Sequence, residues 1–143
     1  MRDDVVEIAH RWIGTPYQHQ ASCEGAGVDC LGLVRGIWRE VVGHEPEKIP
    51  AYTPDWSEPA KDEYLLAALA RVLMPIEKYQ RGDVLAFRMK TGGVAKHLAI
   101  VSALGKTPKI IHAYSGRGVV ETPLSPDWER RIAGAFRFPD RSK

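Results

Sequence analysis

The sequence predicts an α+β protein in which helices pack on one antiparallel β-sheet, and two observations carry this prediction. Up to about residue 73, apolar residues recur at helical spacing. After Pro75 the chain changes to short apolar runs between glycine- and proline-containing turns. Helices followed by strands with short connections are typical of layered α+β folds. A length of 143 residues suits one domain, so we expect a single domain over residues 1–143.

Three helices are expected in the first half of the chain. The first covers Asp3–Ile13 and ends before Pro16, because proline disfavours helical geometry in the residue that precedes it. The second runs from about Asp29 to Val42, with one apolar stripe and Gly43 as its C-terminal stop. The third fits Ala60–Leu73.

The remaining segments divide into irregular stretches and strands. We expect an irregular loop over Tyr17–Val28, and an extended, proline-rich segment over His44–Pro59 that wraps over the core. Asp83 is interpreted as a turn residue and Arg137 as part of a solvated basic tail. The predicted strands are Val84–Arg88, His97–Leu104, Lys109–Ala113, Val119–Glu121 and Ala133–Phe138.

The composition excludes several classes of protein. Twenty Lys and Arg against 18 Asp and Glu give a formal charge of +2, which implies no general attraction to nucleic acid or acidic lipid. We therefore expect neither a nucleic-acid nor a membrane partner. The acidic start and an apolar stretch that stops at Ile13 do not fit a signal peptide, so we expect synthesis in the cytoplasm without an export signal.

Cys30 is the most suggestive single residue for chemistry. It follows the glycine-containing stretch Gly25–Asp29 and falls in the first turn of the second predicted helix. Free backbone N–H groups and the positive end of the helix dipole favour the thiolate there, and the thiolate is the nucleophile. The competing interpretation is a buried structural cysteine, and position alone weighs the two about evenly.

Five histidines could supply the base that cysteine catalysis needs. His10 and His44 fall in or at the end of helices, while His19 lies in the loop near Cys30 and stays a candidate. His97 opens an apolar strand, and His112 interrupts the next one, where a polar ring needs a hydrogen-bond partner. On successive strands the last two could share one face, so that His112 orients the His97 ring as in a catalytic triad.

Cys23 precedes Cys30 by a spacing that fits neither a CxxC redox motif nor the usual zinc-ligand pairs. We interpret it as a spare loop thiol. A zinc site from Cys23, Cys30, His97 and His112 would satisfy a ligand count, but no spacing selects it. No metal or cofactor is therefore expected.

Five pieces of sequence together resemble the NlpC/P60 family of papain-like cysteine peptidases, which cut peptidoglycan stem peptides. The match to Asp-Cys-Leu-Gly-Leu and to the downstream His-Leu-Ala-Ile is the specific part. The pieces are Gly14–Tyr17, Asp29–Val34, Gly82–Val84, His97–Ile100 and Ile111–Ala113. Asp-Cys-Leu-Gly-Leu-Val-Arg-Gly-Ile-Trp and the stretch Ile111–Val120 are similar to the phage-type branch of the family, which includes the cell-wall peptidases of gene transfer agents.

The resemblance implies roles for five residues. Cys30 would be the nucleophile, His97 the base and His112 the polar residue that orients it. Tyr17 and Asp29 would lie at the mouth of the site and contribute to substrate binding or to the oxyanion site. Most of the family has serine after the cysteine, where this chain has Leu31, a departure that bears on substrate contacts rather than on the nucleophile.

The resemblance also implies an activity and a setting. The activity would be hydrolysis of peptidoglycan stem peptides beside D-glutamate and a diamino acid, without a cofactor, by an enzyme carried with a phage-like tail to the cell wall. Two alternatives are a non-catalytic tail-assembly or binding module, and a papain-like amidase or acyltransferase on another amide.

Overall fold

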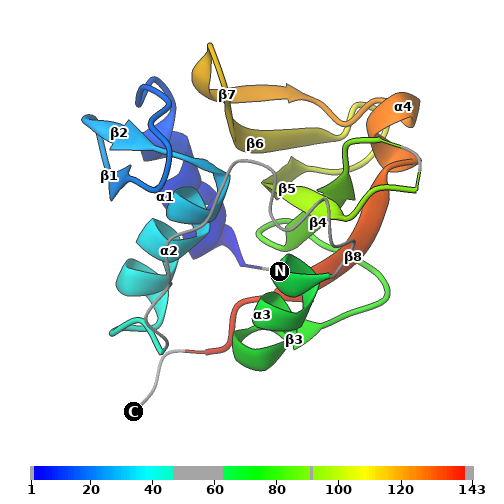
Figure 1. Cartoon of the computed structure of the whole chain (residues 1–143), viewed down its shortest axis with the longest axis horizontal. Helices are drawn as coiled ribbons and strands as arrows, with labels where there is room; N and C mark the ends of the chain where they lie inside the picture. Colours follow the sequence, from blue (N-terminus) through cyan, green and yellow to red (C-terminus); the bar gives the residue numbers. More distant parts are fainter. Residues whose placement is uncertain (1, 47–62, 91, 141–143) are drawn as a thin grey trace.

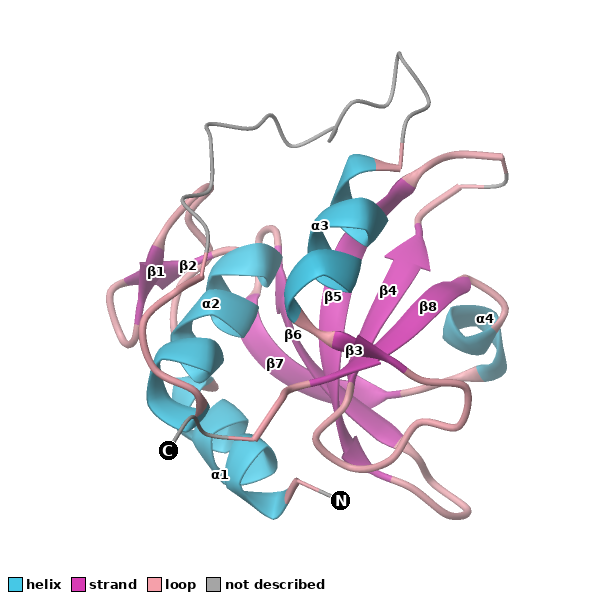
Figure 2. Ribbon diagram, turned by 90° about the horizontal axis from the view of Figure 1, so that it is seen from below, coloured by secondary structure: helices cyan, strands magenta, loops and turns pink. Residues whose placement is uncertain are grey.

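The computed structural model describes residues 2–46, 63–90 and 92–140. Three helices, α1 (Asp3–Trp12), α2 (Cys30–Val41) and α3 (Tyr64–Val72), lie on one face of a six-stranded sheet (Figures 1 and 2). The expected α+β arrangement of helices on a central antiparallel sheet is confirmed.

The strands of the sheet all pair antiparallel, and β4, β5, β6 and β7 are neighbours that follow one another along the chain through short connections. Their order across the sheet is β3-β8-β4-β5-β6-β7. Their bounds are β3 Met74–Pro75, β4 Val84–Arg88, β5 Ala95–Ala103, β6 Lys109–Tyr114, β7 Gly118–Pro123 and β8 Ile132–Arg137. The five predicted strands are confirmed to within two residues at each end. The two-residue β3 and the short helix α4 (Pro126–Glu129) were not predicted, because each is too short to show a period.

Strand residues alternate between two apolar layers, as the two-residue period of a strand requires. One layer, which includes Leu98, Ile100 and Ile111, packs against the three helices. The other, which includes Phe87, Val101 and Ile110, packs on the opposite face with the half-buried Trp128 of α4. The sheet is therefore covered on both faces, and polar side chains in its strands need internal partners.

The helices begin and end close to the predicted residues. The second helix has Asp29 as its N-cap and loses its regular geometry after Val41, before Gly43. The third begins at Tyr64, and residues 60–62 of the predicted helix lie outside the described part of the chain. The same holds for residues 47–59 of the predicted proline-rich segment.

Three expectations are corrected by the structure, and one of them concerns Arg137, which is the last residue of strand β8 rather than part of a solvated tail. The predicted loop over Tyr17–Val28 contains a two-stranded ribbon, β1 (Ser22–Cys23) paired with β2 (Gly27–Val28). Asp83 is fully buried, and both of its oxygens accept hydrogen bonds from the Arg137 guanidinium, at 2.9 and 2.8 Å. Asp83 is thus a core anchor for the last strand, because a buried carboxylate needs a charged partner.

Candidate active site

The predicted catalytic residues meet at one end of the sheet, where β5 begins and β6 ends. A cavity of about 390 Å³ is lined there by residues from helix α2, from strands β5 and β6, and from three loops. The lining residues are Tyr17, His19, Cys30, Met89, Lys96, His97, Ala113, Tyr114 and Ser115. Segments far apart in the sequence thus place a thiol and an imidazole around the same space.

Cys30 owes its position to the residues on either side of it. The Asp29 carboxylate accepts the Gly32 N–H at 2.7 Å, which starts the helix at Cys30. The same carboxylate accepts the Gln20 N–H at 2.6 Å and so holds the preceding loop against the helix. At Gly32 a Cβ atom would lie 1.9 Å from the Ala21 carbonyl oxygen, so only glycine allows this close approach.

The protonation of Cys30 differs from the expectation that helix position alone would activate it. Burial raises the pKa of the Cys30 thiol to about 12, and the nearby Asp29 charge also raises it. Backbone N–H groups of Leu98, Leu31 and Cys30 itself lower the pKa, but less than burial raises it. The resting cysteine is therefore a neutral thiol, with its sulfur 3.8 Å from the Lys96 carbonyl oxygen. A base must remove its proton.

His97 and His112 form the expected pair. The register that places Ile100 opposite Ile111 puts both histidines on the sheet face away from α1–α3, as diagonal neighbours on β5 and β6. Their Nε2 and Nδ1 atoms are 2.8 Å apart. The other ring nitrogen of His112, Nε2, lies 2.9 Å from the Thr122 hydroxyl on β7. A chain of hydrogen bonds therefore crosses three neighbouring strands.

Both imidazoles are neutral near pH 7. Burial lowers the pKa of His97 to about 3, with His112 as a smaller cause. Burial also lowers the pKa of His112 to about 4, and the positive charge of Arg117 adds to the effect. Trp128 packs against both rings, with its ring centroid 5.5 Å from that of His97 and 5.4 Å from that of His112. A neutral His97 can accept a proton from a neutral thiol.

Tyr17 and Asp29 occupy different positions relative to the cavity. Tyr17 lines it and is held by a parallel bridge to Val28, while burial, together with the nearby charge of Asp29, raises the pKa of its hydroxyl to about 12. The phenol is thus a proton donor at neutral pH. Asp29 is 2% exposed, and it is not one of the described residues that line the cavity. Its carboxylate faces the backbone of the helix start and of the preceding loop.

Thr122 and Trp128 also contact the histidine pair, and neither was predicted from the sequence. Thr122 is one of several threonines near turns, and its contact with His112 depends on the register of β6 against β7. Trp128 follows Ser125-Pro126, a helix-start signal that could have revealed α4, since the Ser125 hydroxyl caps it. Nothing in the sequence indicates that this helix covers the histidine pair.

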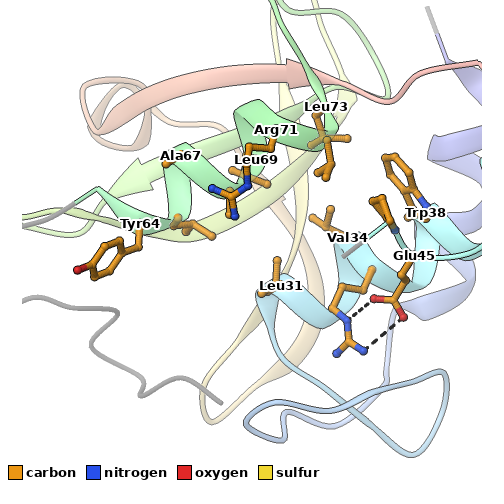
Figure 3. A pocket seen from close by; sticks show the side chains of 14 residues that line it. Leu31, Val34, Trp38, Glu45, Tyr64, Ala67, Leu69, Arg71 and Leu73 are labelled. Carbon is orange, nitrogen blue, oxygen red and sulfur yellow. Dashed lines mark hydrogen bonds and ion pairs between the residues drawn. The ribbon is translucent and has the colours of Figure 1, made fainter. Parts of the chain in front are cut away.

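A second cavity, of about 270 Å³, lies between α2 and α3 and differs in chemistry (Figure 3). Leu31 and Val34 face Leu69 and Leu73 across it, and the Arg35–Glu45 ion pair lies at its rim. Its walls hold neither a thiol nor a histidine among the described residues. The cavity at Cys30 is therefore the candidate active site.

The described residues contain no group of three or more His, Cys, Asp or Glu side chains that could hold a metal ion. Cys23 is an exposed free thiol on β1, whereas Cys30 is buried and free. Within the described ranges, no helix has the length and apolar character needed to cross a bilayer.

Comparisons with known proteins identify the family of this chain. Residues 14–137 match the NlpC/P60 family. The chain is 32% identical over 128 residues to murein DD-endopeptidase MepH of Escherichia coli (strain K12), a match that covers 87% of this chain and 41% of the relative. It is 29% identical over 137 residues to gamma-DL-glutamyl hydrolase of Bacillus subtilis (strain 168), covering 94% of this chain and 29% of the relative. The chain thus spans less than half the length of these curated relatives.

Solved structures share the fold. An NLP/P60-family protein similar to lipoprotein, from Staphylococcus aureus subsp. aureus Mu50, superposes with a TM-score of 0.58 at 21% identity, over 96% of this chain and 42% of that one. The protein Ly7917, solved with the hydrolyzing product of MDP, gives 0.64 at 12% identity, over 97% and 63%. At such identities the likeness establishes the architecture, and the family match covers most of the sequence. The chain belongs to the NlpC/P60 family.

Proposed function

We propose that this protein is a cysteine endopeptidase that hydrolyses peptidoglycan stem peptides, at the amide that joins D-glutamate to a diamino acid. The observation that carries the proposal is the shared cavity of Cys30 and His97, with His97 bonded to His112 at 2.8 Å. The names of both curated relatives, an endopeptidase of murein and a glutamyl hydrolase, support the same class of substrate.

The reaction begins with two neutral groups. The Cys30 thiol rotates away from the Lys96 carbonyl and gives its proton to the free ring nitrogen of His97 as the sulfur attacks the amide carbonyl. The C–N bond then breaks, and the His97 imidazolium returns the proton to the leaving amine. Water attacks the resulting thioester with His97 as base, which releases the carboxylic acid and restores the thiol.

Charge on the substrate oxygen develops beside the first turn of α2. The N–H groups of Cys30 and Leu31 lie close enough to the sulfur to lower its pKa, so they also face the carbonyl that the sulfur attacks. Tyr17, with a protonated hydroxyl at the cavity wall, is placed to donate a further hydrogen bond to the substrate. Asp29 supports this oxyanion site by capping the helix, without itself lining the cavity.

Mass spectrometry of muropeptide digests tests the proposal directly, because it identifies the bond that is cleaved. The names of the two relatives indicate different bonds, an amide between two D-centres and a γ-glutamyl amide, and their products differ in mass. Products that carry an added amine in place of water would instead identify an acyltransferase. The proposal expects cleavage at the γ-glutamyl amide, with addition of water.

Cys30→Ala should abolish turnover while the protein stays folded. Cys23→Ala is the matched control, since Cys23 is an exposed thiol on β1 away from the cavity, and this variant should keep full activity. Cleavage by Cys30→Ala, or an equal loss in both variants, would contradict the assignment of the nucleophile.

We further propose that the enzyme acts as part of a phage-like or gene-transfer-agent tail. The similarity of the sequence around Cys30 and of Ile111–Val120 to the phage-type branch supports this proposal. Proteomic analysis of purified particles from the source organism tests it. Presence of the protein in the tail fraction is expected, and its absence from particles that contain other tail proteins would overturn the proposal.

A further inference from the structure

The hydrogen-bond chain from the active site does not stop at His112. In the register of β6 and β7, His112 lies opposite Val120, which makes Thr122 its diagonal neighbour on the same face. His97 is the corresponding neighbour on β5. The three side chains therefore form one line across the sheet, with contacts of 2.8 and 2.9 Å.

The direction of the protons along this line decides whether His97 can act as a base. In one arrangement, His97 Nε2–H donates to His112 Nδ1, and His112 Nε2–H donates to the Thr122 oxygen. His97 Nδ1 then keeps a free lone pair. In the reverse arrangement, His112 Nδ1–H donates to His97 Nε2, so that His97 carries its proton on Nδ1 and cannot accept one from the thiol.

We infer that Thr122 is a positioning residue, whose hydroxyl accepts the His112 Nε2–H and so holds both histidines in the tautomers that leave His97 Nδ1 free as the base. The inference rests on the proposed function for its catalytic meaning. Its structural content, the tautomer of His112, is independent of any substrate.

The surroundings of His112 favour this arrangement over protonation of the ring. His112 is 2% exposed, covered by Trp128, and shares a smaller cavity of about 170 Å³ with Thr122, Tyr114 and Arg117. Burial of the ring and the cation of Arg117 disfavour a second proton on His112. A doubly protonated His112 would donate from Nδ1 and force His97 into the reverse tautomer. The neutral state of His112 and the Thr122 oxygen that accepts its Nε2–H bond therefore favour the same tautomer.

Two substitutions separate the hydroxyl from the shape of the side chain. Thr122→Val keeps the β-branched volume on β7 and removes the acceptor, while Thr122→Ser restores a hydroxyl. We expect Thr122→Val to lower kcat about tenfold with KM within about twofold, because one hydrogen bond in the relay is lost. Thr122→Ser should recover most of kcat. A structural role alone would not produce this split between kcat and KM.

Nitrogen-15 NMR of the histidine rings gives a readout without substrate. In the wild type, both rings should show the Nε2–H tautomer, and in Thr122→Val the reverse tautomer of His112 should become measurably populated. A wild-type His112 in the Nδ1–H tautomer would overturn the inference, as would a Thr122→Val protein with unchanged tautomers and kcat. If the wild type cleaves no muropeptide, the proposed function fails, but the NMR result still decides the role of Thr122.

Discussion

Substitution of Asp29 can distinguish a structural role of this residue from a role in substrate binding, and the structure predicts how large its effect on stability should be. The carboxylate accepts the Gly32 N–H at 2.7 Å and the Gln20 N–H at 2.6 Å, at 2% exposure. These bonds join the start of α2 to the loop before it. Asp29→Ala removes both acceptors, whereas Asp29→Asn keeps one oxygen for the cap and presents an NH₂ group to the other donor.

The expected cost follows from the two bonds. Loss of an N-cap costs about 1 kcal/mol, and loss of the bond to Gln20, which is an exposed residue that water can reach, costs about 1 kcal/mol more. Asp29→Ala should therefore lower the free energy of unfolding by about 2 kcal/mol. Asp29→Asn should lower it by about 1 kcal/mol, since asparagine caps helices as well as aspartate does.

Urea denaturation followed by circular dichroism at pH 7 measures these differences. A second readout concerns Cys30, whose pKa the Asp29 charge raises. Asp29→Asn should lower the pKa of the thiol and speed its alkylation by iodoacetamide at pH 8, with Cys23→Ala as background to remove the exposed thiol. Wild-type stability in both variants together with a large rise in KM would refute the capping role and identify Asp29 as a substrate contact.

Three further predictions concern stability. Burial lowers the pKa of His97 to about 3 and of His112 to about 4 from an ordinary value of 6.5. Below pH 6.5 the unfolded chain therefore binds more protons than the folded protein, and the free energy of unfolding decreases as the pH is lowered. Lowering the pH from 7 to 5 should reduce the free energy of unfolding by about 2 kcal/mol for each histidine, as measured by urea denaturation. A His97→Gln/His112→Gln variant should lose this pH dependence. The same pH dependence in the variant and the wild type would show that the rings are protonated in the folded protein. Gly32→Ala should cost about 3 kcal/mol in thermal unfolding, because its Cβ would lie 1.9 Å from the Ala21 carbonyl oxygen, and a change below about 0.5 kcal/mol would mean that the loop does not pack there. Asp83→Asn should cost about 3 kcal/mol in guanidinium denaturation by breaking a buried ion pair, while a neutral effect would contradict its role as an anchor of β8.

Local sequence patterns were sufficient to predict those features that depend on a single helix or strand. The helical stripe from Leu33 to Val41 and the short runs such as Val84–Arg88 predicted their elements, because burial of one face imposes a period on the sequence. The position of Cys30 at a helix start follows from the same signal. The buried role of Asp83 was not predicted, because its partner Arg137 lies 54 residues away in the sequence. An aspartate beside a glycine turn also resembles an ordinary turn residue.

Sequence patterns alone predicted the fold class and the family resemblance, and they indicated Cys30, His97 and His112 as the candidate catalytic residues. The protonation states of these three residues, and the partners that orient them, follow from the three-dimensional packing instead. Burial raises the pKa of the Cys30 thiol above what its helix position alone would set, and it lowers the pKa values of both histidines. The contact of His112 with Thr122 depends on strand register, and the cover by Trp128 depends on where α4 packs. Desolvation and register depend on residues distant in the chain, and a local pattern contains neither.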